Sequence, residues 1–371
     1  MRIIFNLYDV LFFKDSRPFN AGDAHLARTQ PFVPPMTVTG AIRAALYSVN
    51  GEKYSSLINV GEEEPGFEVK GVFWCREKGS KNEEKNESNR KECEELFPLP
   101  RDIVSVKGDE GDELTVLTVH RPMHGYRVAT ANGRIHFSET GGYLPERTLI
   151  EYLKGELDDV KDISAKVIPT GEVFKRETRV GIRLEGSKTT VEGLLYRTEN
   201  LRPERDIKVV AWVENDPNLE EGLKKAGAIR LGGEGHFAFI DVKNENPWKE
   251  IENSVAVEGD CIRLYVATPL IIQTDSGYTW DILKLNEVVK ELAGVGVQAE
   301  LVKAFVSKPV RIEGWDVVRK RPKKPRFAVL AGSVYYLKVK EGKVNPVMKL
   351  GELQNLGYGL VFAGNAKCDG G

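Results

Sequence analysis

Histidines are the side chains in this sequence best suited to move a proton near neutral pH or to ligate zinc. There are five of them: His25, His120, His124, His136 and His236. His120 and His124 have the i, i+4 spacing of a helical zinc site, but Pro122 between them disfavours a helix. His25 precedes an expected helix and is a candidate general base, although isolated loop histidines are commonly solvated or capping groups. The sequence has no G-x-S-x-G motif and no D-x-D cluster, so it indicates no catalytic constellation, and neither a metal nor a cofactor is expected.

Two glycine-rich turns could bring backbone amides close to a phosphate. Gly232, Gly233 and Gly235 precede one expected strand, and Gly357 and Gly359 precede another. This order is the reverse of a dinucleotide-binding fingerprint, in which the glycines follow a strand and open a helix. Consecutive amides can bind phosphate oxygens, but the same residues also make tight helix-to-strand turns. From the sequence, both interpretations stay open.

Lysine and arginine side chains in loops rich in glycine and aromatic residues are candidates for RNA contacts, because arginine binds phosphates and stacks on bases. The candidates are Lys14, Arg17, Arg28, Arg43, Arg127, Arg134, Arg176 and Arg179. Tyr126 beside Arg127 interleaves a ring and a cation, as single-strand binders do. The densest basic run is RKRPKKPR at 319–326, with Arg319, Lys320, Arg321, Lys323 and Lys324. It is either a solvated loop or an arm that contacts phosphates.

Composition describes an ordinary globular chain of 371 residues, 41% hydrophobic and 29% charged, with a net charge of −2. Residues 62–113 hold 16 acidic and 9 basic side chains, so the rest of the chain is net positive. No apolar run is long enough for a membrane helix. The four cysteines are far apart with no C-x-x-C, so neither a zinc site nor a disulfide framework is expected, and the cytoplasm is the expected compartment. Few glutamines and many charged residues favour a thermophilic source.

Hydrophobic periodicity then indicates the elements that must position these residues. Strand-like runs lie at 2–8, 67–75, 207–214, 261–272, 299–306, 327–339 and 356–364. Helical patterns follow Thr37 and Asp216 as N-caps in the first half, and Asp281 in the second half. A further short helix is expected from Pro346 to about Leu353. On the first helix, Thr39, Gly40 and Arg43 are expected on the face opposite the apolar one.

Each half therefore follows the order β–α–β–β–α–β, which is the split βαβ unit. The expected fold class is α+β, with tandem ferredoxin-like (RRM-like) domains that carry insertions. We expect an N-terminal domain at 1–250 and a C-terminal domain at 251–371. Within them, 77–113 is expected to be an acidic, mobile insertion, and 308–326 a basic hairpin or loop.

A family resemblance is carried by five segments: DVLFFKDSRPFNAGD (9–23), PPMTVTGAIRAAL (34–46), ETRVGIRLE (177–185), GLLYRTENLR (193–202) and LGGEGHFA (231–238). They resemble the RAMP superfamily of CRISPR proteins, most closely the third-numbered subunit of the type III-B Cmr effector complex. The resemblance spans nearly the whole chain in the family's order. It implies two ferredoxin-like domains and a non-catalytic subunit that binds the 5′ tag of the guide RNA.

The resemblance also implies two protein partners, the large Palm-domain subunit and the adjacent backbone RAMP subunit. Carried onto this sequence, its RNA surface comprises Lys14, Arg17, Arg28, Thr39, Gly40, Arg43 and the Gly232–His236 loop. One alternative is a metal-independent endoribonuclease that processes precursor guide RNA, with His25 as the general acid or base. Another is an adaptor that contacts only proteins. No membrane partner is expected.

Overall fold

The computed structural model describes residues 1–15, 17, 26–77, 93–107, 112–116, 135–136, 141–158, 162–184, 190–272, 286–316 and 318–366. The chain forms two compact units, each built from three stretches of sequence. The first unit contains Met1–Glu94, Gly171–Glu245 and Glu313–Lys324, and the second contains Glu95–Thr170, Asn246–Ile312 and Pro325–Gly371. These units are clusters of contacts, and the domain boundary expected near residue 250 stays a prediction.

The first unit contains ten strands and three helices among its described residues. The strands are β1 (Arg2–Leu7), β2 (Leu26–Ala27), β3 (Val69–Arg76), β10 (Phe174–Leu184), β11 (Thr190–Pro203), β12 (Ile207–Val213), β13 (Ala228–Arg230), β14 (Phe237–Lys243), β19 (Trp315–Asp316) and β20 (Arg321–Pro322). The helices are α1 (Pro35–Asn50), α2 (Ser55–Ile58) and α4 (Pro217–Ala226). A 3-10 turn at Thr170–Glu172 leads into β10.

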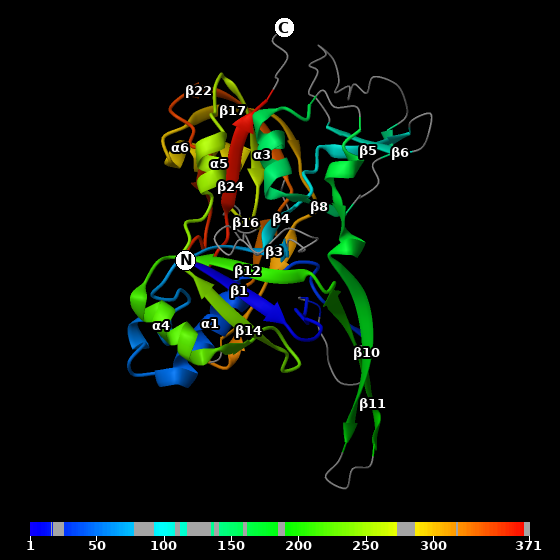
Figure 1. The fold of residues 1–371 in the computed structure, drawn as a ribbon, viewed down its shortest axis with the longest axis vertical. Helices are drawn as coiled ribbons and strands as arrows, with labels where there is room; N and C mark the ends of the chain where they lie inside the picture. Colours follow the sequence, from blue (N-terminus) through cyan, green and yellow to red (C-terminus); the bar gives the residue numbers. More distant parts are fainter. Residues whose placement is uncertain are drawn as a thin grey trace, which may run out of the picture. The chain divides into compact units, whose positions relative to one another are not determined.

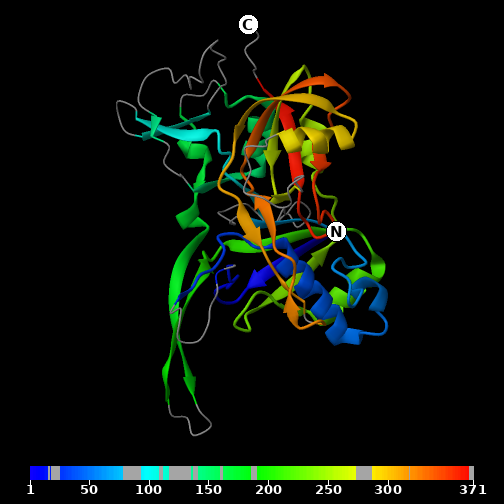
Figure 2. The same ribbon diagram turned by 180° about the vertical axis from the view of Figure 1, so that it is seen from behind.

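The main sheet of the first unit is antiparallel, in the order β13-β14-β1-β12-β3. The chain visits β1, α1, β3, β12, α4 and β14 in turn, which places the first and third strands at the centre, as in a ferredoxin-like unit. α1 and α4 pack against each other and against this sheet (Figures 1 and 2). Gly222 of α4 permits the close contact, because a Cβ there would lie 2.4 Å from Leu46 Cδ2. The long β10–β11 hairpin extends beyond the sheet (Figure 1).

The second unit repeats this strand order with a different set of elements, but without a helix before its last strand. Its strands are β4 (Glu94–Pro98), β5 (Ile103–Lys107), β6 (Asp112–Val116), β7 (Ile135–His136), β8 (Gly142–Pro145), β9 (Ile168–Pro169), β15 (Cys261–Val266), β16 (Leu270–Ile271), β17 (Gln298–Phe305), β18 (Val310–Ile312), β21 (Arg326–Val329), β22 (Val334–Glu341), β23 (Val347–Lys349) and β24 (Leu360–Asn365). Its helices are α3 (Glu146–Lys154), α5 (Lys249–Ser254) and α6 (Asn286–Gly294), with a 3-10 turn at Ser164–Lys166. The central sheet has the order β17-β22-β15-β24-β23.

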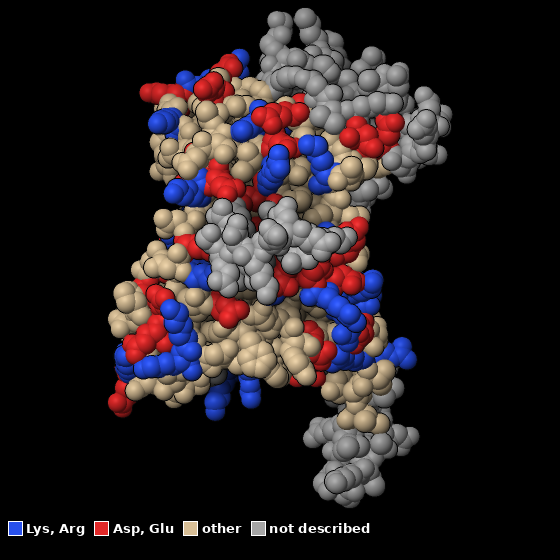
Figure 3. Space-filling view, in the orientation of Figure 1, with Lys and Arg blue, Asp and Glu red and all other residues tan. Residues whose placement is uncertain are grey.

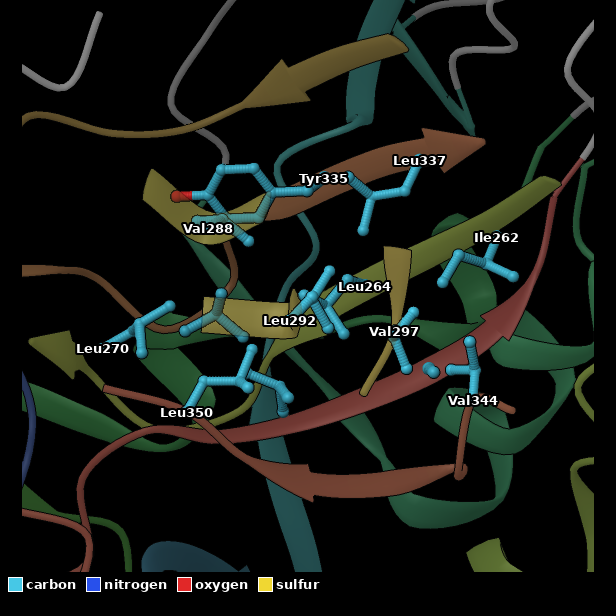
Figure 4. Close-up of a cluster of buried hydrophobic side chains, with 13 residues drawn as sticks. Ile262, Leu264, Leu270, Val288, Leu292, Val297, Tyr335, Leu337, Val344 and Leu350 are labelled. Carbon is cyan, nitrogen blue, oxygen red and sulfur yellow. The ribbon is translucent and has the colours of Figure 1, made fainter. Parts of the chain in front are cut away.

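The core of the second unit forms between this sheet and α6. Val288 and Leu292 of α6 lie in one buried cluster with Leu264 of β15 and Leu337 of β22 (Figure 4). The i, i+4 spacing of the two helical residues puts them on one face, and burial of such side chains stabilises the fold by about 1.5–3 kcal/mol each. The expected α+β, tandem ferredoxin-like class is confirmed.

Most of the expected elements are present, with corrections. The single strands expected at 261–272 and 327–339 are each two strands in different sheets, β15 with β16 and β21 with β22. α4 begins as expected, since the Asp216 carboxylate accepts a hydrogen bond from the Leu219 N–H at 2.8 Å. Thr37, however, is not an N-cap, because α1 begins at Pro35 after Pro34. The short helix expected from Pro346 is absent. The segment instead forms β23, which pairs with β24, and Gly351 then turns the chain with a φ of +76°.

The acidic and basic segments also contain regular structure. β4 and β5 lie within the expected insertion 77–113, and residues 78–92 and 108–111 lie outside the described residues. In the basic segment, β19 and β20 form a two-stranded hairpin. No helix in the described ranges is long and apolar enough to cross a membrane.

A disulfide joins Cys75 on β3 to Cys93 just before β4, with Cα atoms 5.5 Å apart. Cys261 is disulfide-bonded as well. The expectation of no disulfide framework is therefore wrong. Cys75 and Cys93 are 18 positions apart in the sequence, and it is the fold that brings them together. Spacing without a C-x-x-C motif could not indicate this contact.

Candidate nucleic-acid interface

The loop after β1 presents three cations to solvent. Leu11 exchanges backbone hydrogen bonds with Leu201 of β11, and Phe12 and Phe13 are buried. These anchors hold the loop, so the side chains that follow point outward: Lys14, Arg17 and Arg28 are all exposed.

The three cations differ in how far they are already engaged. The Lys14 ammonium donates to the carbonyls of Asp15 and Arg17. The Arg17 side chain is 65% exposed, with its Nε 3.4 Å from Asp15 Oδ2. Arg28 has no ion pair within the described part of the chain. Loosely held, solvated cations of this kind remain able to meet a phosphate.

A cluster of two carboxylates and two arginines ties this loop to the β10–β11 hairpin. The Arg179 guanidinium donates two hydrogen bonds to Asp9, at 2.7 and 2.9 Å, and its Nε donates to Glu177 at 2.9 Å. Arg202 donates to the other oxygen of Glu177. We call Asp9, Glu177, Arg179 and Arg202 the carboxylate–arginine cluster. Basic and acidic side chains lie side by side where the hairpin meets the sheet (Figure 3).

The cluster fixes the charge of both acids. The hydrogen bonds from Arg179 lower the pKa of Asp9 to about 2. Hydrogen bonds from Arg202 and then Arg179 lower the pKa of Glu177 to about 2. Arg179 is therefore engaged with its carboxylates in this structure, and its contact with RNA stays a prediction. The same holds for Arg176, whose guanidinium pairs with Glu199.

The Gly232–His236 loop packs against the loop after β1. The Gly233 N–H donates to the Phe12 carbonyl at 2.9 Å. A Cβ on Gly232, where φ is +85°, would lie 2.5 Å from that carbonyl oxygen. Gly232 and Gly233 are thus required by packing, whereas Gly235 has open space around it. His236 is half-buried, with Nδ1 3.8 Å from Asp9 Oδ2.

The second glycine turn offers no comparable surface. Gly357 and Gly359 are buried, and their N–H groups donate to the carbonyls of Gln354 and Pro269. A Cβ on Gly359 would lie 1.9 Å from the Leu350 carbonyl oxygen. These glycines make a tight turn, and their amides are not available to a phosphate in this structure.

On α1, the three expected residues have different surroundings. Thr39 is buried, and its hydroxyl donates to the Pro35 carbonyl, which corrects its expected place on the open face. The Arg43 guanidinium is half-buried and donates to the carbonyls of Asn59 and Glu62, so it holds the loop after α2. Gly40 is exposed, and nothing lies within 4 Å of a Cβ built there. A glycine inside a helix lowers its stability by about 0.5–1 kcal/mol relative to alanine, and no packing contact explains the glycine at this position.

The basic hairpin combines cations with an exposed ring. Arg319 donates to Asp316 at 2.9 Å and to the Gly61 carbonyl at 2.8 Å, which fixes the hairpin within its unit. Lys320 and Arg321 are exposed, and Lys323 and Lys324 continue the run. Trp315 is 58% exposed on β19. The sequence pattern that singled out Tyr126 and Arg127, a ring among cations, could also have found Trp315.

Several candidates cannot be placed. Tyr126, Arg127, Arg134 and His25 lie outside the described residues, as do His120 and His124. His136 lies on β7. In the described ranges, no group of three or more histidine, cysteine or acidic residues could hold a metal ion.

The second unit contains a buried charge cluster that no ligand can reach. Arg263 is fully buried, pairs with Asp158, and lies over the Tyr152 ring at 4.5 Å. Asp102 accepts hydrogen bonds from the hydroxyls of Tyr152 and Tyr336, at 2.7 and 2.6 Å. Burial raises the pKa of Asp102. Its enclosure makes this a structural cluster rather than a binding site.

The fold defines a class, that of tandem ferredoxin-like proteins. The family model described as CRISPR-associated protein (Cas_Cmr3) matches residues 6–366. The chain belongs to this family and is thus a RAMP-type subunit of type III-B Cmr complexes.

Several solved structures are similar to this chain at low sequence identity. A chain of the type III-B Cmr-beta complex bound to cognate target RNA is 17% identical, with a TM-score of 0.50 over 91% of this chain and 86% of that one. A chain of the Cmr-beta complex bound to cognate target RNA and AMPPnP is 17% identical, with a TM-score of 0.49 over 91% of this chain and 86% of that one. A chain of the Csm3–Csm4 subcomplex from a type III-A system gives 13% and 0.42 over 94% and 95%. No curated protein matches the sequence.

Proposed function

We propose that this subunit binds the 5′ tag of the guide RNA and joins the large Palm-domain subunit to the adjacent backbone subunit, without catalysing a reaction. The observation that carries the proposal is the loop after β1, anchored on β11 and on the glycine loop, with Lys14, Arg17 and Arg28 turned to solvent. Single-stranded RNA gains affinity from each phosphate that such cations neutralise. The Cmr-beta complex, which contains a chain of this fold, is bound to target RNA.

Two further surfaces of the first unit fit an RNA ligand. Gly40 leaves a gap in the side chains of α1 where a backbone could approach. The basic hairpin offers Lys320 and Arg321 beside Trp315, a pairing of phosphate contacts with a stacking ring. The chain has a net charge of only −2, and we assign the rest of its surface to interfaces with the two protein partners. The cytoplasm stays the expected compartment, and a disulfide is compatible with it in a hyperthermophile.

The test uses purified full-length protein, a chelator, and labelled guide RNA with or without its 5′ tag, in the presence or absence of the large subunit. We expect intact RNA and tag-dependent binding that the large subunit strengthens. The variant Arg17→Glu/Arg28→Glu should weaken binding and make the salt dependence shallower by about 0.7 in slope per lost phosphate contact.

The matched control is Lys249→Glu/Lys343→Glu, which makes the same charge change at exposed positions of the second unit. Equal weakening in both variants would reduce the effect to net charge and contradict the proposed surface. Specific cleavage of the RNA in chelator would overturn the non-catalytic proposal and favour the endoribonuclease alternative, with His25→Ala as the next variant.

A further inference from the structure

Three aromatic side chains lie exposed together where β1 ends and β14 begins. Tyr8, Phe237 and Phe239 are 79%, 43% and 52% exposed. The Tyr8 ring is stacked on that of Phe237, with centroids 6.1 Å apart and planes 10° apart. Phe237 and Phe239 meet edge to face at 5.8 Å. We call these three residues the aromatic platform.

Strand alternation explains why these rings face solvent. Along β14, Ala238 and Ile240 are buried, while Phe237 and Phe239 alternate with them on the open face. The rings therefore add little to the core of their own unit. On the strands of the main sheet of the first unit, the large exposed apolar side chains are Phe237 and Phe239, and Tyr8 directly follows β1. A mostly uncharged area lies over β14 in Figure 3.

We propose that the aromatic platform stacks an unpaired base of single-stranded RNA. This inference rests on the proposed function and names a site for it. The outer face of the Tyr8 ring is open, so a base placed there would extend the existing Tyr8–Phe237 stack by one ring. RNA-binding sheets of the same β–α–β–β–α–β order hold splayed bases on exposed rings in this manner. Every base has a π face, so such a site tolerates different sequences.

The charges beside the aromatic platform indicate on which side of the rings the RNA backbone would pass. Arg230 on β13 lies opposite Phe237 in the antiparallel pair, is exposed, and has no ion pair within the described residues. It can meet the phosphate next to a stacked base. At the other end of β14, Asp241 accepts a hydrogen bond from the Asn6 amide at 2.7 Å. Its carboxylate would repel a phosphate, so the backbone should pass on the Arg230 side.

A protein partner is the other class of ligand that exposed rings could meet. The observations favour RNA, because the platform consists of aromatic rings, two of which are already stacked, and an exposed arginine lies at its border. An apolar protein contact would need only apolar area, whereas base stacking needs the rings themselves. Replacing a ring by leucine therefore separates the two.

The test measures binding of an eight-nucleotide single-stranded RNA with 2-aminopurine at its centre to the full-length protein. Stacking quenches this fluorophore. We expect quenching by the native protein and about tenfold weaker binding with loss of quenching in Tyr8→Leu and in Phe239→Leu. Tyr8→Trp, which keeps a ring, should bind as well as the native protein. The control is Tyr47→Leu, which removes an exposed ring from α1.

Thermal unfolding of each variant shows that it is folded, and the tagged guide RNA is titrated in parallel. Unchanged affinity and quenching in the leucine variants would overturn the aromatic platform alone, provided that the native protein binds the tagged RNA. Loss of large-subunit binding at unchanged RNA affinity would assign the rings to a protein interface and overturn it as well. No RNA binding by the native protein would overturn both this inference and the proposed function.

Discussion

The two units share a strand order but place their charges in opposite environments. In the first unit, Asp9 and Glu177 are partly exposed and receive hydrogen bonds from arginines, and the pKa of each falls to about 2. In the second unit, Asp102 lies near Arg263 and receives two tyrosine hydrogen bonds, yet its pKa rises because it is fully buried. A nearby arginine thus does not decide the direction of the shift, and burial can outweigh it.

The glycine turns follow the same division. In the first unit the turn lies at the surface, and Gly235 has open space around it. In the second unit the corresponding turn is buried against the Leu350 carbonyl. The same strand order therefore occurs with an exposed glycine turn in the first unit and with a buried glycine turn in the second. Four predictions test this difference between the units, in order from the largest expected effect to the smallest.

Arg263→Met should destabilise the protein most. It leaves Asp158 buried without its partner, and removing one member of a buried ion pair costs about 3–5 kcal/mol. Urea-induced unfolding would measure the loss. Arg230→Met, at an exposed position, is the control and should change the free energy of unfolding by less than about 0.5 kcal/mol. Similar values for the two variants would contradict the buried role of Arg263.

Cys75→Ala/Cys93→Ala should cost about 3 kcal/mol, because the disulfide closes a short loop and limits the unfolded chain. Melting temperatures with and without reductant would measure this contribution. We expect reductant to lower the melting temperature of the native protein more than that of the double variant. An equal response of the two would show that this disulfide contributes little.

Gly359→Ala and Gly235→Ala test the two glycine turns directly. Both residues have positive φ, but only the Cβ at Gly359 would meet a backbone oxygen, at 1.9 Å. We expect a loss of about 2–3 kcal/mol at Gly359 and about 1 kcal/mol at Gly235, where only the backbone conformation is strained. Equal losses in the free energy of unfolding, measured by chemical denaturation, would contradict the difference between the buried and the exposed glycine turn.

The pH dependence should be the smallest effect, and the two units should contribute with opposite signs. Asp9 and Glu177 have a lowered pKa, so their contribution to stability is present above about pH 4.5 and is lost as the pH falls toward 2. Asp102 has a raised pKa, so its contribution is fully present below pH 3.8 and is lost as the pH rises. Solvent exposure keeps the first effect modest.

Melting temperatures measured from pH 6 down to pH 2 would check both signs. The variant Asp9→Asn/Glu177→Gln should lose stability less steeply than the native protein. Asp102→Asn should lose stability more steeply than the native protein. In the native protein, protonation of the buried Asp102 at low pH favours the folded state, and asparagine cannot take up this proton. Parallel curves for all three proteins would show that these carboxylates do not set the acid response.

Elements with strong local signals were predictable from the sequence. The Asp216 cap, Pro217 and Gly227 mark α4 at both ends, and apolar runs mark β1 and β12. The segment after Pro346 was not predictable, because pairing with β24 overrides its local preference. Thr39 was misplaced because helical periodicity alone does not show how wide the buried face of α1 is.

The candidate site was predictable only in part. Lys14, Arg17 and Arg28 follow from a basic loop, and their exposure fits the expectation, while their contact with RNA stays a prediction. Arg179 was expected to face RNA, but its main partner, Asp9, lies 170 residues away in the chain. Such partners depend on tertiary structure, which the spacing of residues does not reveal. The same limit hid the Cys75–Cys93 disulfide.

That disulfide also determines what a break in the chain would do. A protease that cut once between Cys75 and Cys93 would leave both fragments covalently joined. The nicked protein would migrate as one species on a non-reducing gel and as two after reduction. A single cut between the two cysteines therefore does not separate the N-terminal fragment from the rest of the chain until the disulfide is reduced.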